Sequence, residues 1–341
     1  MVDKRSRVST DIDFERDGKQ TGYLSLPFSR HASAYGRVLL PIVSIRNGTG
    51  PRVLLVAGNH GDEYEGQIAL MRLARELTPD QVRGRIVIMP AANLPAVEAA
   101  NRVSPLDGGN LNRLFPGEPE GGPTTMIAHY IEHVLLAISD YVIDLHSGGS
   151  SLEYLPCALI RDSGAPDRVE KTFAAMRAFG APVTYVTDGR NAGAERTLAA
   201  AADRQGVVAI TTELGGGATL KQAGLNLAEG GVRRLLRHVG AWRGNAPPNG
   251  HATRLLAVEG LDYYVFATEE GVFEPVAIPG DAVREGQLAG YVHLPHAPWR
   301  EPETVAFRRS GLVICRRFPC ATKRGDCLYQ IATDYKGAQA A

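Results

Sequence analysis

This chain has few cysteines and tryptophans, and neither charge is in excess. Its 341 residues include four cysteines and two tryptophans, and 37 lysines and arginines balance 37 aspartates and glutamates. Four cysteines are too few for a disulfide framework, and Cys315, Cys320 and Cys327 have a spacing that matches no common structural zinc site. The zero net charge favours neither nucleic acid nor an anionic membrane as a partner.

Long hydrophobic runs are also missing. The N-terminal stretch MVDKRSRVSTDIDFERDGKQ is charged and lacks the apolar core of a signal peptide. No apolar stretch reaches the ~18 residues that a membrane span requires. We therefore expect a cytoplasmic protein with reduced thiols, whose partner is a small molecule rather than nucleic acid or a membrane. A homo-oligomer is compatible with the sequence, which does not specify the subunit count.

Predicted strands alternate with predicted helices through the first two thirds of the chain. The apolar runs predict strands at 52–57, 85–89, 141–145 and 206–212, and the helical periodicity predicts helices at 63–77, 124–138, 166–179, 195–205 and 225–240. This alternation predicts an α/β fold with a mainly parallel sheet flanked by helices. The Asn-, Pro- and Gly-rich stretch 91–123 is long for a simple connection, so we expect a functional loop there.

The composition changes at AWRGNAPPNG, residues 241–250, which is typical of a linker. After it only short strands are predicted, so we expect three parts: an N-terminal segment 1–36, an α/β domain 37–245 and a small all-β domain 251–335. In the last part, VREGQLAGYV (283–292) and TKRGDCLYQI (322–331) form a weak internal repeat. The repeat resembles the half-barrels of biotinyl and lipoyl domains and predicts a barrel-like domain. No lysine lies at the expected hairpin tip between the copies, which argues against a carrier role.

Three predicted strands end next to residues that can bind a metal or transfer a proton. His60 and Glu63 follow the first, Asp144 and His146 end another, and Glu213 ends the fourth. Because parallel strands end at one edge of a sheet, these side chains should converge. Two histidines and one carboxylate leave one position open on a zinc ion, as in catalytic sites, and Glu213 is then the candidate base. Asp144 is either a support for the metal ligand or a structural acid.

Each of these residues has an ordinary structural interpretation when taken alone: a helix start, a loop histidine or a helix cap. A rival motif also exists, because His129, Glu132 and His133 match the inverted zincin pattern H-x-x-E-H. The apolar residues of that helix lie on its other side. We therefore expect this polar face to be exposed to solvent rather than to bind a metal.

The long loop carries Arg102 and the pair Asn112 and Arg113. An arginine fork can hold a carboxylate through two parallel hydrogen bonds, which would suit a substrate with a free carboxylate beside a metal. The alternative is a structural role, in which these side chains tie down the loop.

Taken together, the chemistry-bearing residues resemble the succinylglutamate desuccinylase/aspartoacylase family in order and position, over roughly residues 35–335. The residues that carry the resemblance are Gly58, His60, Glu63, Asn93, Arg102, Asn112, Arg113, Asp144, His146 and Glu213. These enzymes are zinc-carboxypeptidase-like and cleave N-acyl amino acids. The resemblance implies a zinc-carboxypeptidase-like catalytic domain with one Zn²⁺ per chain on His60, Glu63 and His146. It implies Glu213 as general acid and base and Arg102 on the scissile carbonyl, and it places Asn112 and Arg113 on the substrate carboxylate.

Within the family, the stretches AANLPAV, SPLDGGNLNRLFPG and DLHSGGSSLEYLP are most similar to the branch of ectoine breakdown. That branch hydrolyses N-alpha-acetyl-L-2,4-diaminobutyrate to acetate and 2,4-diaminobutyrate. The alternatives are a desuccinylase or aspartoacylase-type deacylase of another N-acyl amino acid and, ranked lower, a non-catalytic binding module. A substrate with a cationic side chain calls for an acidic partner, for which Glu153, Asp188 and Glu195 are candidates.

Overall fold

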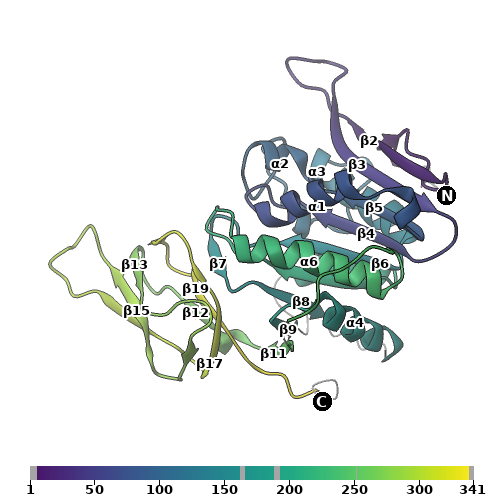
Figure 1. The fold of residues 1–341 in the computed structure, drawn as a ribbon. Coiled ribbons are helices and arrows are strands. Elements are labelled where there is room, and N and C mark those ends of the chain that lie inside the picture. The colour runs from purple at the N-terminus through teal and green to yellow at the C-terminus, as the bar shows by residue number, and fades with distance from the viewer. Residues whose placement is uncertain (1–5, 162–165, 188–192, 251, 338–341) are drawn as a thin grey trace.

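A computed structural model describes residues 6–161, 166–187, 193–250 and 252–337. One large mixed sheet runs through the molecule, with helices on both of its faces (Figure 1). Its strand order is β1-β2-β3-β5-β4-β6-β10-β8-β9-β11-β19-β17-β14, and β12 and β7 pair off this path with β19 and β17. The predicted α/β class is confirmed.

The centre of the sheet is parallel. Its four neighbouring strands are β5 (Gly84–Met89), β4 (Arg52–Ala57), β6 (Tyr141–His146) and β10 (Val208–Glu213). These strands are nearly continuous apolar runs because helices cover both of their faces. Four of the predicted strands are therefore confirmed. The parallel arrangement also brings the carboxyl ends of β4, β6 and β10 to one edge.

Antiparallel pairs flank this centre on both sides, and parallel pairs recur further along, so the sheet as a whole is mixed rather than mainly parallel. On one side lie β1 (Ser9–Thr10), β2 (Gly18–Pro27) and β3 (Arg37–Asn47). Buried and more exposed residues alternate along much of β2 and β3, as in an antiparallel pair with one solvated face. On the other side β8 (Cys157–Arg161) runs antiparallel to β10 and parallel to β9 (Val183–Thr187). The periodicity analysis predicted neither β8 nor β9.

Two helical layers enclose the sheet. The face built by Val53 and Leu55 packs against α1 (Tyr64–Glu76), α4 (Pro166–Phe179) and α6 (Gln222–His238), which lie across the sheet in Figure 1. The face built by Leu54 and Val56 packs against α3 (Pro123–Tyr130) and α5 (Leu198–Arg204). The predicted helix 124–138 is present, but it continues from α3 through a π turn (Ile131–Leu135) and a 3-10 turn (Leu136–Ile138). None of the helices in the described ranges is long and apolar enough to cross a bilayer.

The C-terminal part is built from strands. β11 (Arg254–Val258) lies parallel to β9, and thereby joins β12 (Tyr264–Phe266), β14 (Ala282–Val283), β17 (Gly311–Arg317) and β19 (Cys327–Asp334) to the main sheet. A second sheet contains β16 (Glu303–Ala306), β15 (Leu288–His293), β13 (Gly271–Pro275) and β18 (Ala321–Thr322). β7 (Leu152–Tyr154) pairs with β17. These C-terminal strands enclose a core of their own, centred on Phe273, Phe307 and Tyr329.

Candidate metal centre

The turn that follows β4 carries two of the predicted ligands. Gly58 takes a positive φ of +70° and turns the chain out of the strand, and Glu63 is the N-cap of α1. Gly61, between His60 and Glu63, has no room for a side chain, because an added Cβ would lie 1.8 Å from the carbonyl oxygen of Ala96. The close approach of this turn to α2 (Leu94–Glu98) therefore requires glycine and sets the position of both ligands.

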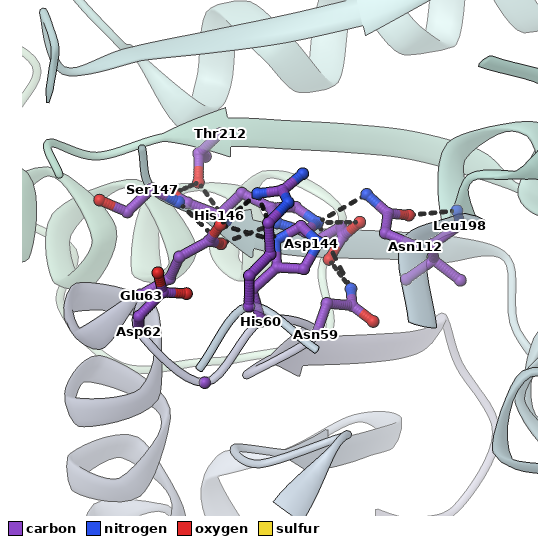
Figure 2. A network of polar contacts seen from close by, with 12 residues as sticks. Asn59, His60, Asp62, Glu63, Asn112, Asp144, His146, Ser147, Leu198 and Thr212 are labelled. Carbon is purple, nitrogen blue, oxygen red and sulfur yellow. Dashed lines mark hydrogen bonds and ion pairs between the residues drawn. The ribbon is translucent and has the colours of Figure 1, made fainter. Parts of the chain in front are cut away.

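His60, Glu63 and His146 meet at the edge of the sheet, as their positions at strand ends predicted (Figure 2). The Nδ1 atom of His60 lies 2.6 Å from Oε1 of Glu63, and Nδ1 of His146 lies 2.9 Å from Oε2. One ligand atom from each residue lies within 4.8 Å of the others, so the group can bind a metal. Burial alone would raise the pKa of Glu63, but the two adjacent imidazoles hold it far below its ordinary value. Glu63 is therefore an anion between two nitrogen donors, a set that suits zinc.

Asp144 supports His146 from the side opposite Glu63. Its Oδ2 lies 2.9 Å from Nε2 of His146, and its Oδ1 accepts a hydrogen bond of 2.7 Å from the amide of Asn59. An Nε2–H group that donates to Asp144 leaves the Nδ1 lone pair directed at the metal position. The sequence left the role of Asp144 open, and this geometry favours support of the ligand.

Asn112 also lies beside the His146 imidazole. Its Nδ2 lies 3.1 Å from Nε2 of His146, and its Oδ1 accepts a hydrogen bond of 2.8 Å from the backbone of Leu198 at the start of α5. Because Nε2–H of His146 donates to Asp144, the Asn112 amide packs against this imidazole without a hydrogen bond, and its hydrogen-bonded link runs from the long loop to α5. Its predicted contact with substrate stays a prediction.

Glu213 ends β10 directly beside His146, which is its partner in the β6–β10 register. Burial raises the pKa of Glu213 well above its ordinary value, and the charge of Glu63 raises it further, whereas His146 and Arg102 oppose the shift. Among the described residues its Oε2 has no hydrogen-bond partner. A buried carboxyl group with a free oxygen and a raised pKa has the properties of a proton-transfer group.

All seven predicted site residues line one cavity, which we call the metal cavity. The Arg102 guanidinium lies 3.7 Å from Oε1 of Glu63, and its side chain is 41% exposed. Arg113 donates a hydrogen bond of 2.7 Å to the backbone oxygen of Asn112. Burial lowers the pKa of Arg113, and the charge of Arg102 lowers it further. Two neighbouring arginines beside a metal group therefore provide a positive field suited to a small carboxylate.

The sequence missed part of this cavity. Leu159 and Arg161 of β8 and Thr187 of β9 line it, as does Tyr154 of β7. No periodic signal marked these short strands. Ser147 follows the ligand His146, and its backbone N–H donates to Oε2 of Glu63 over 3.1 Å.

The rival motif has a structural role, and the expectation that it faces solvent is wrong. His129 and Glu132 are buried, and the rings of His129 and His133 lie 4.6 Å apart. Glu132 accepts hydrogen bonds of 2.9 and 2.7 Å from Arg204 of α5, which provides the charge partner that the sequence did not reveal. In the described part of the chain, His60, Glu63 and His146 are the group with metal-binding geometry.

The structure describes two of the three acidic residues that were candidates to bind a cationic substrate side chain. Glu153 is already paired with Lys221 and Arg316, at 2.9 and 2.8 Å. Glu195 is exposed in a 3-10 turn (Ala194–Arg196). Asp188 lies outside the described residues.

Comparisons with known proteins identify the family of the chain. Residues 49–239 match the family model described as the succinylglutamate desuccinylase/aspartoacylase catalytic domain. The chain is 38% identical over 327 residues to an N-alpha-acetyl-L-2,4-diaminobutyric acid deacetylase from Halomonas elongata, covering 96% of this chain and 95% of that protein.

Solved structures give the same result over nearly the whole chain. A succinylglutamate desuccinylase/aspartoacylase from Rhodobacter sphaeroides superposes with a TM-score of 0.92 and 37% identity, covering 97% of this chain and 100% of that one. The product-bound ectoine utilization protein EutE (DoeB) from Ruegeria pomeroyi superposes with a TM-score of 0.91 and 39% identity, covering 96% of this chain and 99% of that one. The resemblance that the ordered motif residues indicated is thus confirmed: this chain belongs to the succinylglutamate desuccinylase/aspartoacylase family.

Proposed function

We propose that this protein is a zinc-dependent amidohydrolase that removes the acetyl group from N-alpha-acetyl-L-2,4-diaminobutyrate. Water is consumed, the amide C–N bond breaks, and acetate and 2,4-diaminobutyrate leave, a step of ectoine breakdown. The observation that carries the proposal is the single cavity that holds His60, Glu63 and His146 beside Glu213. The Halomonas elongata relative and the EutE (DoeB) structure support this substrate class.

His60, Glu63 and His146 would hold one Zn²⁺, since two imidazoles and one carboxylate are the donor set of catalytic zinc sites. Bound there, the ion would supply a Lewis acid and a water with a lowered pKa. Asp144 keeps the His146 imidazole in the orientation that exposes Nδ1.

The remaining steps belong to side chains of the chain itself. Arg113, assisted by Asn112, binds the substrate carboxylate and positions the amide in the cavity. Arg102 donates hydrogen bonds to the amide oxygen as negative charge develops on it. Glu213 takes the proton of the attacking water and then delivers it to the leaving nitrogen.

The test pairs metal content with acetate release. We expect about one zinc per chain and release of acetate from N-alpha-acetyl-L-2,4-diaminobutyrate in preference to N-acetylaspartate and to succinate release from N-succinylglutamate. Glu213→Gln should abolish turnover and retain the metal, whereas Glu170→Gln, on the exposed face of α4, should leave both unchanged. Metal with another substrate preference would favour the desuccinylase or aspartoacylase-type alternative. Normal turnover of Glu213→Gln would remove Glu213 from its role.

We also propose the division into an N-terminal segment 1–36, a catalytic domain 37–245 and a barrel-like β domain 251–335. The separate core around Phe273, Phe307 and Tyr329 supports the last of these. A cytoplasmic location fits the proposed metabolic role. Family membership argues against the non-catalytic module, and intact-protein mass would detect the prosthetic group that a carrier needs.

A further inference from the structure

A second cavity opens beside Glu213, between the main sheet and the C-terminal strands, and we call it the side chamber. Its floor is one face of the sheet, because neighbouring strands place Leu159 opposite Tyr185, and Thr187 opposite Val258. Arg113, Tyr154, Leu159, Thr187 and Glu213 line both the side chamber and the metal cavity. The two are therefore adjoining spaces.

Two C-terminal strands, β12 and β19, also form a wall of the side chamber. Tyr264 and Phe266 of β12 and Gln330 of β19 line it. The rings of Tyr264 and Phe266 are stacked, with centroids 5.9 Å apart and planes at 22°. Nε2 of Gln330 donates a hydrogen bond of 3.0 Å to the Tyr264 hydroxyl. This bond leaves Oε1 of Gln330 as an acceptor whose contact in the described structure is a long one, 4.0 Å from the thiol of Cys315.

The positions of the arginines decide which half of a substrate reaches the side chamber. Arg102, His60 and His146 line only the metal cavity, whereas Arg113 lines both. If Arg113 holds the substrate carboxylate and Arg102 lies beside the acyl carbonyl, the acyl half stays in the metal cavity and the amino-acid half extends toward Arg113. The amino-acid half, with its side chain, lies on the side of the chamber.

The lining charges decide which side chain fits. Arg113 and Glu213 are the charged residues among those that line the side chamber. An anionic side chain would meet no cation besides Arg113, which already holds the carboxylate. Glu153 is held by Lys221 and Arg316 and is not among the lining residues. A cation would instead meet the carboxyl group of Glu213 and aromatic rings, which attract ammonium groups through their quadrupoles.

We propose that the side chamber is the side-chain subsite, and that it selects a short side chain ending in an ammonium group. The aromatic rings of Tyr264 and Phe266 and the amide oxygen of Gln330 recognise the cation, beside the carboxyl group of Glu213 that also lines the chamber. The inference rests on the proposed deacylase function and adds to it the means of selecting the substrate.

The first experiment measures kcat/KM of the zinc-loaded wild type with three acetylated amino acids of similar side-chain length. The side chains of 2,4-diaminobutyrate, norvaline and glutamate end in ammonium, methyl and carboxylate. We expect about a tenfold preference for ammonium over methyl, the size of a desolvated cation–π contact, and a still lower value for carboxylate. A preference for methyl or carboxylate over ammonium would overturn the proposal.

The second experiment replaces side chains of the C-terminal strands that line the side chamber. Phe266→Leu and Gln330→Leu should each lower the ammonium-to-methyl ratio by about three- to tenfold and change the norvaline value by less than about twofold. Tyr291→Leu is the matched control, because Tyr291 is a half-buried aromatic residue of β15 in the second sheet and does not line the chamber. An unchanged ratio in both chamber variants would overturn the proposal. If Phe266→Leu fails to fold, Gln330→Leu decides alone, and an unchanged ratio in that variant would overturn the proposal.

A binding measurement separates this proposal from the proposed function. Calorimetry with the free amino acids and Glu213→Gln should show tighter binding of 2,4-diaminobutyrate than of norvaline, and the difference should shrink in the Gln330→Leu background. Equal binding of the two would overturn the subsite. No acetate release from any substrate by the wild type, with selective binding retained, would overturn the deacylase function and leave the subsite standing.

Discussion

Replacing Glu153 by Gln tests the assignment of this carboxylate to a structural ion-pair network. Glu153 of β7 and Arg316 of β17 are direct partners in the antiparallel register. Both the Nε and the Nη2 atom of Arg316 bond to Oε2, at 2.9 and 2.8 Å, and Nζ of Lys221 bonds to Oε1 at 2.9 Å. The network joins the start of helix α6 and the C-terminal strand β17 to β7, the short strand that follows the ligand His146 along the chain.

The magnitude follows from how exposed each partner is. Glu153 and Arg316 are 20% and 26% exposed, so their charge-assisted pair contributes about 1–2 kcal/mol to the free energy of unfolding. Lys221 is 40% exposed, and solvent screening reduces its pair to about 0.3 kcal/mol. We expect Glu153→Gln to lower the free energy of unfolding by about 2 kcal/mol at pH 7.

The effect depends on pH with a defined sign. Burial would raise the pKa of Glu153, but the hydrogen bonds from Lys221 and Arg316 lower it below its ordinary value. A depressed folded-state pKa stabilises the protein above the unfolded-state pKa of about 4.3, and the stabilisation is lost as the pH falls through the folded value. The difference between wild type and variant should therefore be complete at pH 7 and decrease below about pH 4.3.

Urea unfolding at pH 7 and at lower pH measures the difference, with Glu170→Gln, on the exposed face of α4, as the control. Glu153→Gln should also keep the ammonium-to-methyl ratio of kcat/KM within about twofold. A stability loss below about 0.5 kcal/mol would refute the network reasoning. A selective loss of the ammonium substrate would make Glu153 the cation partner instead.

Three further variants test the metal turn and the rival motif. Gly61→Ala should lower zinc affinity at least tenfold by equilibrium dialysis, because its Cβ would collide with the backbone of α2, whereas Gly250→Ala, in open space, should not. Asp144→Asn weakens the support of its histidine, so zinc affinity in a chelator competition should fall about 10–100-fold, and unchanged affinity would exclude that support. Glu132→Gln breaks the buried pair with Arg204 and should lower the free energy of unfolding by about 2 kcal/mol without loss of zinc, whereas zinc loss would revive the motif as a metal site.

The elements that a local pattern specifies were predictable. β4 is apolar after its first residue, β6 begins with an apolar run, and α1 and α4 have clear helical periodicity, so each lies close to its expected bounds. The convergence of His60, Glu63 and His146 was also predictable, because it needs only parallel strands that end at one edge.

What the sequence could not supply depends on partners far along the chain. β8 enters the sheet antiparallel to β10 because of tertiary pairing, and its short apolar run before Arg161 gives no periodic signal. The burial of Glu132 depends on Arg204, 72 residues later. The contact of Asn112 with His146 joins a loop to a strand end in the same way.

The linker at 241–250 suggested a detached C-terminal domain, yet β11 returns to pair with β9 and brings β12 and β19 over the side chamber. The metal turn and Glu213 follow or end central strands, whereas Phe266 and Gln330, proposed to contact the cation, belong to the C-terminal strands β12 and β19. Substitutions at Phe266 or Gln330 can then alter side-chain selection without moving the metal ligands. This separation of chemistry from selection would let one hydrolytic centre act on different acylated amino acids when only the C-terminal strands change.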